Sequence, residues 1–276
     1  MAINDKLLFK EAISMEMFSP STGALFWTLE DLKDVNISFS SEADEKTDAR
    51  DAVIAKYYKA KTAQITGNTS FFTLSLVAAQ FGSDKVNATS TAKLIVPKRE
   101  KIKIGYSEGT TANTTVTLSE IPIGTSGSEI PFIYIIDDKK NQTKTYEVGT
   151  AASATKFAID ASTKTITLPT DTDNIKGNYS VLVFYKYEAE AAVEVVNNAN
   201  DMPKSGELWI EAIFTDICDK NIEYHGWYVL NSAQLSPDTE LPLDKTGDFP
   251  FTIDSLADYC SEGGQLFRIV IPDVTD

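Results

Sequence analysis

Short alternating segments separated by turn residues fill residues 99–200, and this pattern constrains the fold more than any other feature of the chain. Seven segments there are rich in Val, Ile, Thr, Tyr or Phe: Lys101 to Tyr106, Thr114 to Leu118, Pro131 to Asp137, Lys144 to Val148, Lys156 to Ile159, Lys164 to Leu168 and Asn178 to Ala189. No helical period runs through them. Seven strand candidates in about 100 residues are typical of a β-sandwich, with the very apolar stretch at 179–187 as a central strand.

A long hairpin is predicted ahead of this block. Val35, Ile37 and Phe39 alternate with polar residues, which is the pattern of a half-buried strand. The stretch at 53–66 is long enough to be the return strand, and the charged residues 42–50 lie between the two. The sequence therefore predicts a hairpin with a charged tip.

Two short helices are predicted outside residues 99–200. Residues 71–81 carry apolar side chains at helical spacing, with Thr69 or Ser70 as the cap and Gly82 as the stop. The stretch from Asp254 to Cys260 is predicted to form one or two helical turns.

Three further strands are predicted near the end of the chain: Glu207 to Thr215, Tyr224 to Leu230 and Leu266 to Ile271. The predicted order of elements in this part, strand, helix and strand, repeats that of the first part. The simplest organisation is therefore one mainly β domain built from residues 1–98 and 201–276, interrupted by an inserted β-sandwich at residues 99–200, with a boundary near Pro97.

The charge of the chain is strongly acidic. Its 40 Asp and Glu residues against 25 Lys and Arg residues give a formal net charge of −15, and residues 201–276 alone hold 15 of the acidic and 4 of the basic residues. Such a surface repels phosphate backbones, which argues against proteins that wrap or read nucleic acid. Two explanations stay open: general solubility, or a surface past which DNA slides without sticking.

The cellular setting is predicted from the cysteines and the apolar segments. Two cysteines, Cys218 and Cys260, exclude a disulfide framework and leave one bridge or two buried thiols. Residues 1–10 lack the apolar region of a signal peptide, and no window approaches about 18 consecutive apolar residues. We therefore expect a soluble protein made in a cytosol, with no membrane partner.

Candidate catalytic and metal-binding residues are few. Ligand types for zinc gather at Asp216, Cys218, Asp219, Glu223 and His225, but without zinc-site spacing, so a surface loop is favoured. His225 is the single histidine of the sequence, so a Ser/His/Asp or Cys/His catalytic site would depend on it. A calcium-like run at 171–177 lacks the required glycine and glutamate positions, which favours a turn. The sequence therefore predicts no enzyme activity, no cofactor and no metal.

Paired tyrosines in the return strand allow two interpretations. Tyr57 and Tyr58 lie among Lys56, Lys59 and Lys61. Rings with basic neighbours can stack on nucleic-acid bases, whereas rings on a strand often pack across the hairpin. The acidity of the chain favours packing.

Taken together, the layout resembles the major tail proteins, or tail tube proteins, of tailed bacteriophages. The resemblance lies in the long hairpin, in the run Thr-Asp-Ala-Arg-Asp at 47–51 that introduces its return strand, and in the helix at 69–82. Residues 207–215, 248–252 and 266–272 are similar to the final strands of that family. The block at 99–200 is similar to the Ig-like insertions of many virion proteins. The placement of this insertion is unusual, and the hairpin tip has less glycine than the family pattern.

The resemblance implies a mainly β fold: a tail-tube-like β-sandwich or barrel with one or two short helices, interrupted by an inserted Ig-like β-sandwich. It implies a virion structural protein, typically a hexameric ring whose inner sheets join into one barrel, with rings stacked into a tube that conducts DNA during ejection. The implied partners are other copies of the chain and other tail or portal-proximal virion proteins, while DNA passes without specific binding. The implied location is the virion tail, after synthesis in the host bacterial cytoplasm.

The hairpin is the predicted assembly element, because long strands with free edges favour pairing between subunits. The candidate inter-subunit residues are, in chain order, Val35, Ile37, Phe39, Glu42, Asp48, Arg50, Asp51 and Tyr57. The alternative interpretation is a capsid decoration or head-fibre protein that carries the Ig-like module outward.

Overall fold

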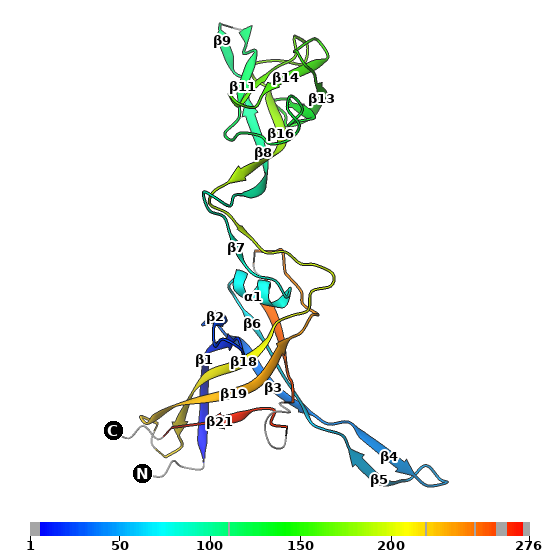
Figure 1. Cartoon of the computed structure of the whole chain (residues 1–276), viewed down its shortest axis with the longest axis vertical. Helices are drawn as coiled ribbons and strands as arrows, with labels where there is room; N and C mark the ends of the chain where they lie inside the picture. The colour runs from blue at the N-terminus through cyan, green and yellow to red at the C-terminus, as the bar shows by residue number, and fades with distance from the viewer. Residues whose placement is uncertain (1–5, 110, 219, 246, 258–263, 273–276) are drawn as a thin grey trace. The chain divides into compact units, whose positions relative to one another are not determined.

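The computed structural model describes residues 6–109, 111–218, 220–245, 247–257 and 264–272, and it is mainly β (Figure 1). Within these residues there is one α-helix. The chain divides into two compact units: unit 1 contains residues 1–85 and 195–276, and unit 2 contains residues 86–194. The predicted fold class, a mainly β sandwich or barrel with little helix, is confirmed.

Unit 1 is built on an eight-stranded antiparallel sheet. The strands along the sheet are β2 (Leu25–Leu29), β1 (Leu7–Phe18), β18 (Ser205–Asp216), β19 (Glu223–Leu235), β20 (Phe249–Ser255), β6 (Thr62–Thr69) and β3 (Lys33–Ser40). The eighth, β21 (Arg268–Val270), pairs with β19. The strands predicted at 207–215, 224–230 and 266–271 are therefore present.

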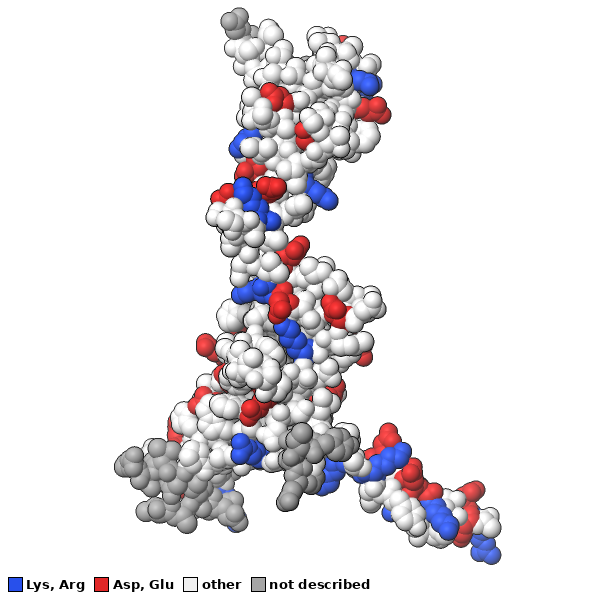
Figure 2. All heavy atoms as spheres, viewed as in Figure 1, with Lys and Arg blue, Asp and Glu red and all other residues white. Residues whose placement is uncertain are grey.

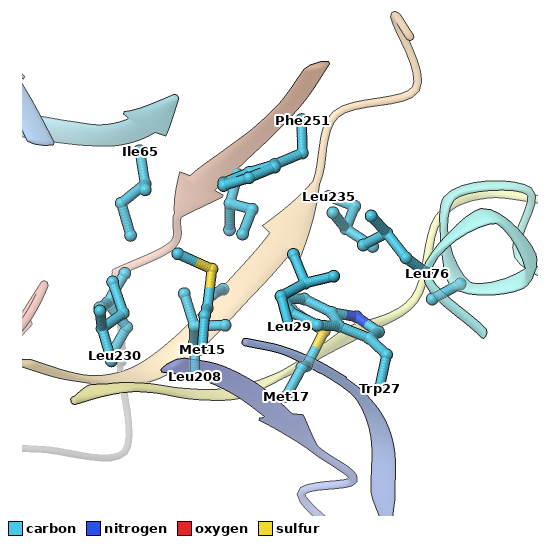
Figure 3. Close-up of a cluster of buried hydrophobic side chains, with 14 residues drawn as sticks. Met15, Met17, Trp27, Leu29, Ile65, Leu76, Leu208, Leu230, Leu235 and Phe251 are labelled. Atoms are coloured by element: carbon cyan, nitrogen blue, oxygen red, sulfur yellow. The ribbon is translucent and has the colours of Figure 1, made fainter. Parts of the chain in front are cut away.

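The core of unit 1 forms where one face of this sheet curves around apolar side chains. Alternate residues of β18 and β6 are buried, as the strand period of two requires. Figure 3 shows side chains of this cluster pointing toward one another, including Met15, Trp27, Leu208 and Phe251, all of them buried. The short helix α1 (Leu74–Gln80) adds Leu76 to the same cluster.

The predicted hairpin is present and has two parts. Strand β3 pairs with β6 inside the sheet, while β4 (Ala43–Thr47) pairs with β5 (Val53–Tyr58) in a separate two-stranded ribbon (Figure 1). The return strand is interrupted between β5 and β6, and at the entry to the ribbon the backbone N–H of Lys59 donates to the carbonyl of Glu42. We call residues 42–59 the ribbon.

Helix α1 is shorter than the sequence predicts. Thr73 is its N-cap and makes no side-chain cap hydrogen bond, so neither Thr69 nor Ser70 caps it. Thr69 is buried in β6, opposite Phe249, because sheet pairing outcompetes helix capping there. Gly82, with a φ of 68°, follows the helix as predicted, in the left-handed conformation that favours glycine.

The second predicted helix is wrong where the structure describes it. Asp254 and Ser255 belong to β20, which pairs with Ala63 to Thr69 of β6 and buries alternate residues. Ladder pairing on both edges of β20 therefore overrides the weak local helical signal. Residues 258–260 of this prediction lie outside the described residues.

Unit 2 holds all seven strands predicted for its block. The order along its sheet is β11 (Thr115–Thr117), β15 (Thr165–Thr167), β14 (Lys156–Asp160), β13 (Gln142–Val148), β12 (Phe132–Ile136), β16 (Ser180–Ala189) and β8 (Leu94–Lys103). Among the described strands of this sheet, β13 and β14 alone pair in parallel. Strand β16 has neighbours on both sides, as predicted for the most apolar segment. The short pairs β9 (Tyr106–Glu108) with β10 (Thr111–Ala112), and β7 (Val86–Asn87) with β17 (Val193–Glu194), complete the unit.

The boundaries of the units differ from the predicted ones. The predicted boundary near Pro97 falls inside β8, where Pro97 lies opposite Lys186. Proline is tolerated there because β8 is the last strand of its sheet and needs no second ladder partner. The division falls instead between residues 85 and 86 and between residues 194 and 195. That the middle unit is an inserted, Ig-like module stays a prediction.

Candidate assembly surfaces of unit 1

Among the strand edges of unit 1 that have no ladder partner in the described part of the chain, two are eight residues long. Strand β3, eight residues long, ends the sheet order on one side. On the other side, β2 covers only Met15–Phe18 of β1, so the eight residues before Met15 pair with β18 alone. Unpaired strand edges present free backbone N–H and C=O groups that another chain can use.

An apolar slot lies between these two edges. Its volume is about 340 Å³, and both free-edge strands contribute: Phe9 and Ala12 come from β1, and Val35, Ile37 and Phe39 come from β3. It is completed by Ile210, Ala212, Tyr228, Phe267 and Ile269. Phe9 is 57% exposed and Phe39 is 54% exposed at its rim. The core is therefore left uncovered where the two edges face each other.

The ribbon adds a second uncovered surface. Its strands pair only with each other, and Val53, Ile54, Tyr57 and Tyr58 are all exposed. A single two-stranded ribbon is marginally stable at best in water, so exposed apolar side chains on it favour docking against another surface.

Ion pairs lie across the ribbon. Lys59 Nζ lies 3.1 Å from a carboxylate oxygen of Glu42 and 3.5 Å from one of Asp44, and Lys56 Nζ lies 2.5 Å from one of Glu45. Figure 2 shows this mixture of basic and acidic side chains along the ribbon. All are solvent-exposed, and such pairs contribute only about 0–1 kcal/mol each.

The ribbon tip is a tight turn organised by one carboxylate. Oδ1 of Asp48 accepts backbone N–H bonds from Arg50 at 2.8 Å and from Ala52 at 3.0 Å. Asp51 adopts a φ of 60°, which Asp tolerates better than most residues. The Arg50 side chain is exposed and has no ion-pair partner within the described residues.

The opposite face of the sheet carries carboxylates. Register places Glu11, Glu16, Glu207, Glu211 and Glu223 of β1, β18 and β19 on the face that points away from the core. A hydrogen bond from Lys10 to Glu223, 2.7 Å long, raises the pKa of that lysine. Among the described residues this face therefore carries more carboxylates than cations, beside the aromatic rings of Phe18, Trp209 and Trp227.

A comparison of the sequence with known protein families shows where this chain belongs. The model of the YomU/Tube protein family matches residues 7–269, which is nearly the whole chain. The chain belongs to the YomU/Tube protein family. No curated protein matches it. The family is a phage structural family of the tube type rather than an enzymatic one, which supports a virion tail protein.

The predicted site residues of this YomU/Tube protein fall into three places. Val35 and Ile37 are half-buried in the slot, and Phe39 lies at its rim. Glu42 and Tyr57 lie on the ribbon, and the three residues of the tip are Asp48, Arg50 and Asp51. Three of these residues therefore line the slot, whereas the other five lie on the ribbon. The assembly role of all eight stays a prediction.

Sequence reasoning missed part of the slot. Phe9, Phe267 and Ile269 belong to it, but they lie near the two ends of the chain, far in sequence from the hairpin. Phe9 belongs to a strand whose alternation is interrupted by register shifts at Phe9–Glu11 and Ala12–Ser14, so its strand period is weak. That the phenyl ring of Phe9 is exposed and lines the slot can be recognised only from the fold.

One residue from each of the zinc and calcium candidates makes hydrogen bonds within the fold. His225 Nδ1 lies 2.8 Å from Glu211 on the carboxylate face, and no group of three possible metal ligands gathers among the residues that the structure describes. Asp219 lies outside them. Asp171 organises a turn, accepting bonds from the Tyr146 hydroxyl and from Asn174.

In this YomU/Tube chain, no helix within the described ranges has the length and apolar character needed to cross a membrane.

Proposed function

We propose that this protein is the major tail tube subunit of a phage, which associates with copies of itself into stacked rings that conduct DNA. The observation that carries the proposal is the apolar slot, which lies between two unpaired strand edges of one sheet. In a monomer, both edges and the slot are open to water. Neighbouring copies that add their strands at these edges pair the free backbone groups and cover the slot.

Ring formation follows from the difference between the two edges. The open half of β1 and the whole of β3 are each eight residues long, but they are different surfaces. Pairing β3 of one copy with β1 of the next is a heterologous, head-to-tail contact, which closes into a ring when the rotation allows. The sheets of neighbouring copies then form one continuous barrel.

The ribbon is the element proposed for contact between rings. Its apolar side chains are uncovered, and its tip carries the unpaired cation of Arg50. In a stack, the tip contacts opposite charges on a neighbouring copy, while Tyr57 and Tyr58 gain packing partners. This arrangement orders the ribbon on assembly.

The carboxylate face is the proposed lining of the conduit. Unit 1 holds 27 acidic and 13 basic residues, and five of its glutamates lie on the face that points away from the core. Negative charge repels the phosphates of DNA, so the DNA slides without binding.

Electron microscopy and sedimentation of the purified full chain test this function. Negative-stain images should show rings or tubes, and sedimentation should show large polymers at micromolar concentration. Monomers or trimers alone would instead favour a decoration or head-fibre protein. Phe9→Asp places a charge at the slot rim and should prevent assembly, whereas Thr28→Asp on the carboxylate face is the matched control and should assemble normally.

A further inference from the structure

A polar cavity lies beside the end of helix α1, within unit 1. Its volume is about 330 Å³. The helix end contributes Gln80 and Phe81, and the remaining residues precede β18 or follow β19: Asn197, Asp201, Pro203, Pro237, Thr239 and Leu241. All of these residues belong to one compact unit, so the cavity is formed by unit 1 alone.

Two polar groups at this cavity have no hydrogen-bond partner within the described residues. The side chain of Gln80 is 5% exposed, and its amide is unpartnered. The hydroxyl oxygen of Thr239 is buried and is unpartnered as well. Buried polar groups are normally hydrogen-bonded, because a group left without a partner destabilises the fold. These two groups therefore indicate that the cavity receives polar atoms from another molecule.

The polar lining is rich in hydrogen-bond acceptors. One oxygen of the exposed Asp201 carboxylate accepts a hydrogen bond from the side chain of Asn198, 2.7 Å long, and the other accepts none within the described residues. The amide oxygen of Gln80 and the hydroxyl of Thr239 are further acceptors. A guanidinium group matches such a lining, because it carries a positive charge and several donors and has no acceptor. Its aliphatic stem also packs on apolar side chains, which here are Phe81, Pro203, Pro237 and Leu241.

Arg50 is the arginine placed to fill such a cavity. Arg99 and Arg268, the other arginines of the sequence, lie within strands that pair in sheets. Arg50 lies on the turn at the end of the ribbon, and its exposed side chain has no ion-pair partner in the part of the chain that the structure describes. Backbone hydrogen bonds to Asp48 hold the turn, so the Arg50 side chain is available to another copy.

The ribbon and the cavity lie at opposite ends of β6. The ribbon precedes the first residue of this strand, and α1 follows its last residue (Figure 1). Strand β19 runs in the same direction as β6, because both pair antiparallel with β20, so the residues after β19 lie at the α1 end as well. An eight-residue strand spans about 26 Å, so Arg50 does not reach the cavity of its own copy. The ribbon enters this cavity only from a second copy of the chain.

This inference rests on the proposed function, in which the strands of neighbouring copies form one barrel. Strand ends lie at the two rims of a barrel, so the ribbon leaves one rim and the cavity lies at the other. Rings stacked in one orientation bring these two rims together. The contact is head-to-tail, so it repeats from ring to ring instead of closing.

A second pair of surfaces matches in the same arrangement. Tyr57 and Tyr58 of the ribbon are exposed, as are Phe71 and Phe72 ahead of α1. The ribbon from Val53 to Tyr57 covers about 13 Å, and the seven residues of α1 cover about 10 Å. With the ribbon tip beside the last residue of the helix, the tyrosines therefore reach the phenylalanines ahead of its first residue.

We propose that the ribbon of each copy docks along α1 of a copy in the next ring, with the Arg50 guanidinium in the cavity beside Gln80. The Asp201 carboxylate pairs with the guanidinium, while the Gln80 amide oxygen and the Thr239 hydroxyl accept its remaining hydrogen bonds. The ribbon tyrosines pack against the two phenylalanines ahead of the helix. Assembly thereby satisfies buried polar groups that a single copy leaves unpartnered.

Charge reversal tests the pairing of Arg50 with Asp201. Asp201→Lys and Arg50→Glu should each cause the loss of long polymers at low salt, measured by sedimentation of the full chain, while the double variant should restore them. Asp138→Lys, in the exposed loop between β12 and β13 of unit 2, is a control with the same change of charge. It should leave polymer length unchanged and should not rescue Arg50→Glu. Long polymers in the Asp201→Lys chain, or a double variant no better than the single ones, would overturn the inference.

Gln80→Leu separates stacking from stability. Leucine is similar in size and has no polar atoms in its side chain, so the substitution removes an unpartnered amide from the dispersed chain and should raise its denaturation midpoint. The same substitution removes an acceptor for Arg50 and should shorten the polymers. A lowered midpoint with polymers of normal length would show that the amide serves the fold of unit 1, and would overturn the inference.

Crosslinking locates the contact between copies. Arg50→Cys with Asp201→Cys, in a chain with Cys218→Ser and Cys260→Ser, should join assembled copies into a long covalent ladder after treatment with a short bismaleimide. Either new cysteine alone should give at most dimers. A ladder that stops at one closed ring would place the contact within a ring and overturn the inference.

The failure of this inference is distinguishable from the failure of the proposed function. In each of the contrary outcomes above, the unmodified chain still forms polymers, so the proposed function stands. The absence of rings and tubes from the unmodified chain contradicts the proposed function, and this inference with it.

Discussion

Gly67 lies opposite Phe251 in the ladder between β6 and β20, and the phenyl ring of Phe251 fills the space that a side chain at position 67 needs. A Cβ atom added to Gly67 would lie 2.6 Å from Cζ of Phe251 and 3.1 Å from Cγ2 of Val35. Phe251 is buried in the core, so its ring cannot turn outward. The glycine thus allows β20 and β3 to pack closely around the same ring.

Gly67→Ala should destabilise unit 1 by about 1–3 kcal/mol, the usual cost of overpacking a filled core. Chemical denaturation monitored by tryptophan fluorescence measures this change. Because the clash is with one ring, the double variant Gly67→Ala with Phe251→Leu should be less destabilised than the sum of the two single variants. Strict additivity would show that the ring does not limit position 67.

Two neighbouring apolar residues of β3 should respond differently to the same substitution. Ile37 is half-buried and packs against the core, so Ile37→Asp buries a charge and should prevent folding. Phe39 is 54% exposed at the slot rim, so Phe39→Asp should leave the fold intact and block assembly. Circular dichroism reports folding, and sedimentation reports assembly. Equal loss of folding in both variants would mean that the slot rim is part of the core.

The strands were predictable because their signals are local. The alternation of Val35, Ile37 and Phe39, and the apolar run that forms β16, depend only on side chains two residues apart. The hairpin was also predictable, because its two arms are close in sequence and the ladder follows from their order.

The slot was not predictable, because it joins distant parts of the chain. Phe9 meets Phe214 and lines the slot with Phe267 and Ile269, which lie near the opposite end of the sequence. The first turn of α1 was misplaced for a related reason. Thr69 is a good capping residue locally, but its partner in β20 decides its conformation.

The stability of unit 2 should fall in acid because of one turn. The Tyr146 hydroxyl donates a 2.6 Å hydrogen bond to Asp171, and this bond and those from Asn174 lower the pKa of the Asp171 carboxyl. A lowered folded-state pKa gives stability above the unfolded value of about 3.9, which is lost as the pH falls through the folded value. The melting temperature should therefore drop less between pH 6 and pH 3 in Asp171→Asn than in the unmodified chain. An equal drop would mean that this carboxyl contributes nothing.

Unit 2 should fold alone, since its core is made only of residues between 86 and 194. A fragment of these residues should give dispersed amide NMR signals and a cooperative thermal transition. Replacing the unit by a short Gly/Ser bridge should leave a unit 1 that still assembles. A fragment that stays unfolded would show that the unit needs the rest of the chain.

Charge at the ribbon tip should control the contact between rings and not the fold. Asp48 holds the turn by accepting backbone bonds, while the Arg50 side chain is exposed and has no ion-pair partner in the described residues, so Arg50→Glu leaves the turn intact.

In a stack, the reversed charge should repel the acidic surface that the arginine contacts and shorten the polymers. The effect should fade as salt rises from about 0.1 M to about 1 M, because the Debye length falls from about 10 Å to about 3 Å. Sedimentation across this range measures the change, and Lys85→Glu, at an exposed position of unit 1, is a control of equal charge. Polymers of unchanged length at low salt would show that the tip is a solvated turn and that the rings are held elsewhere.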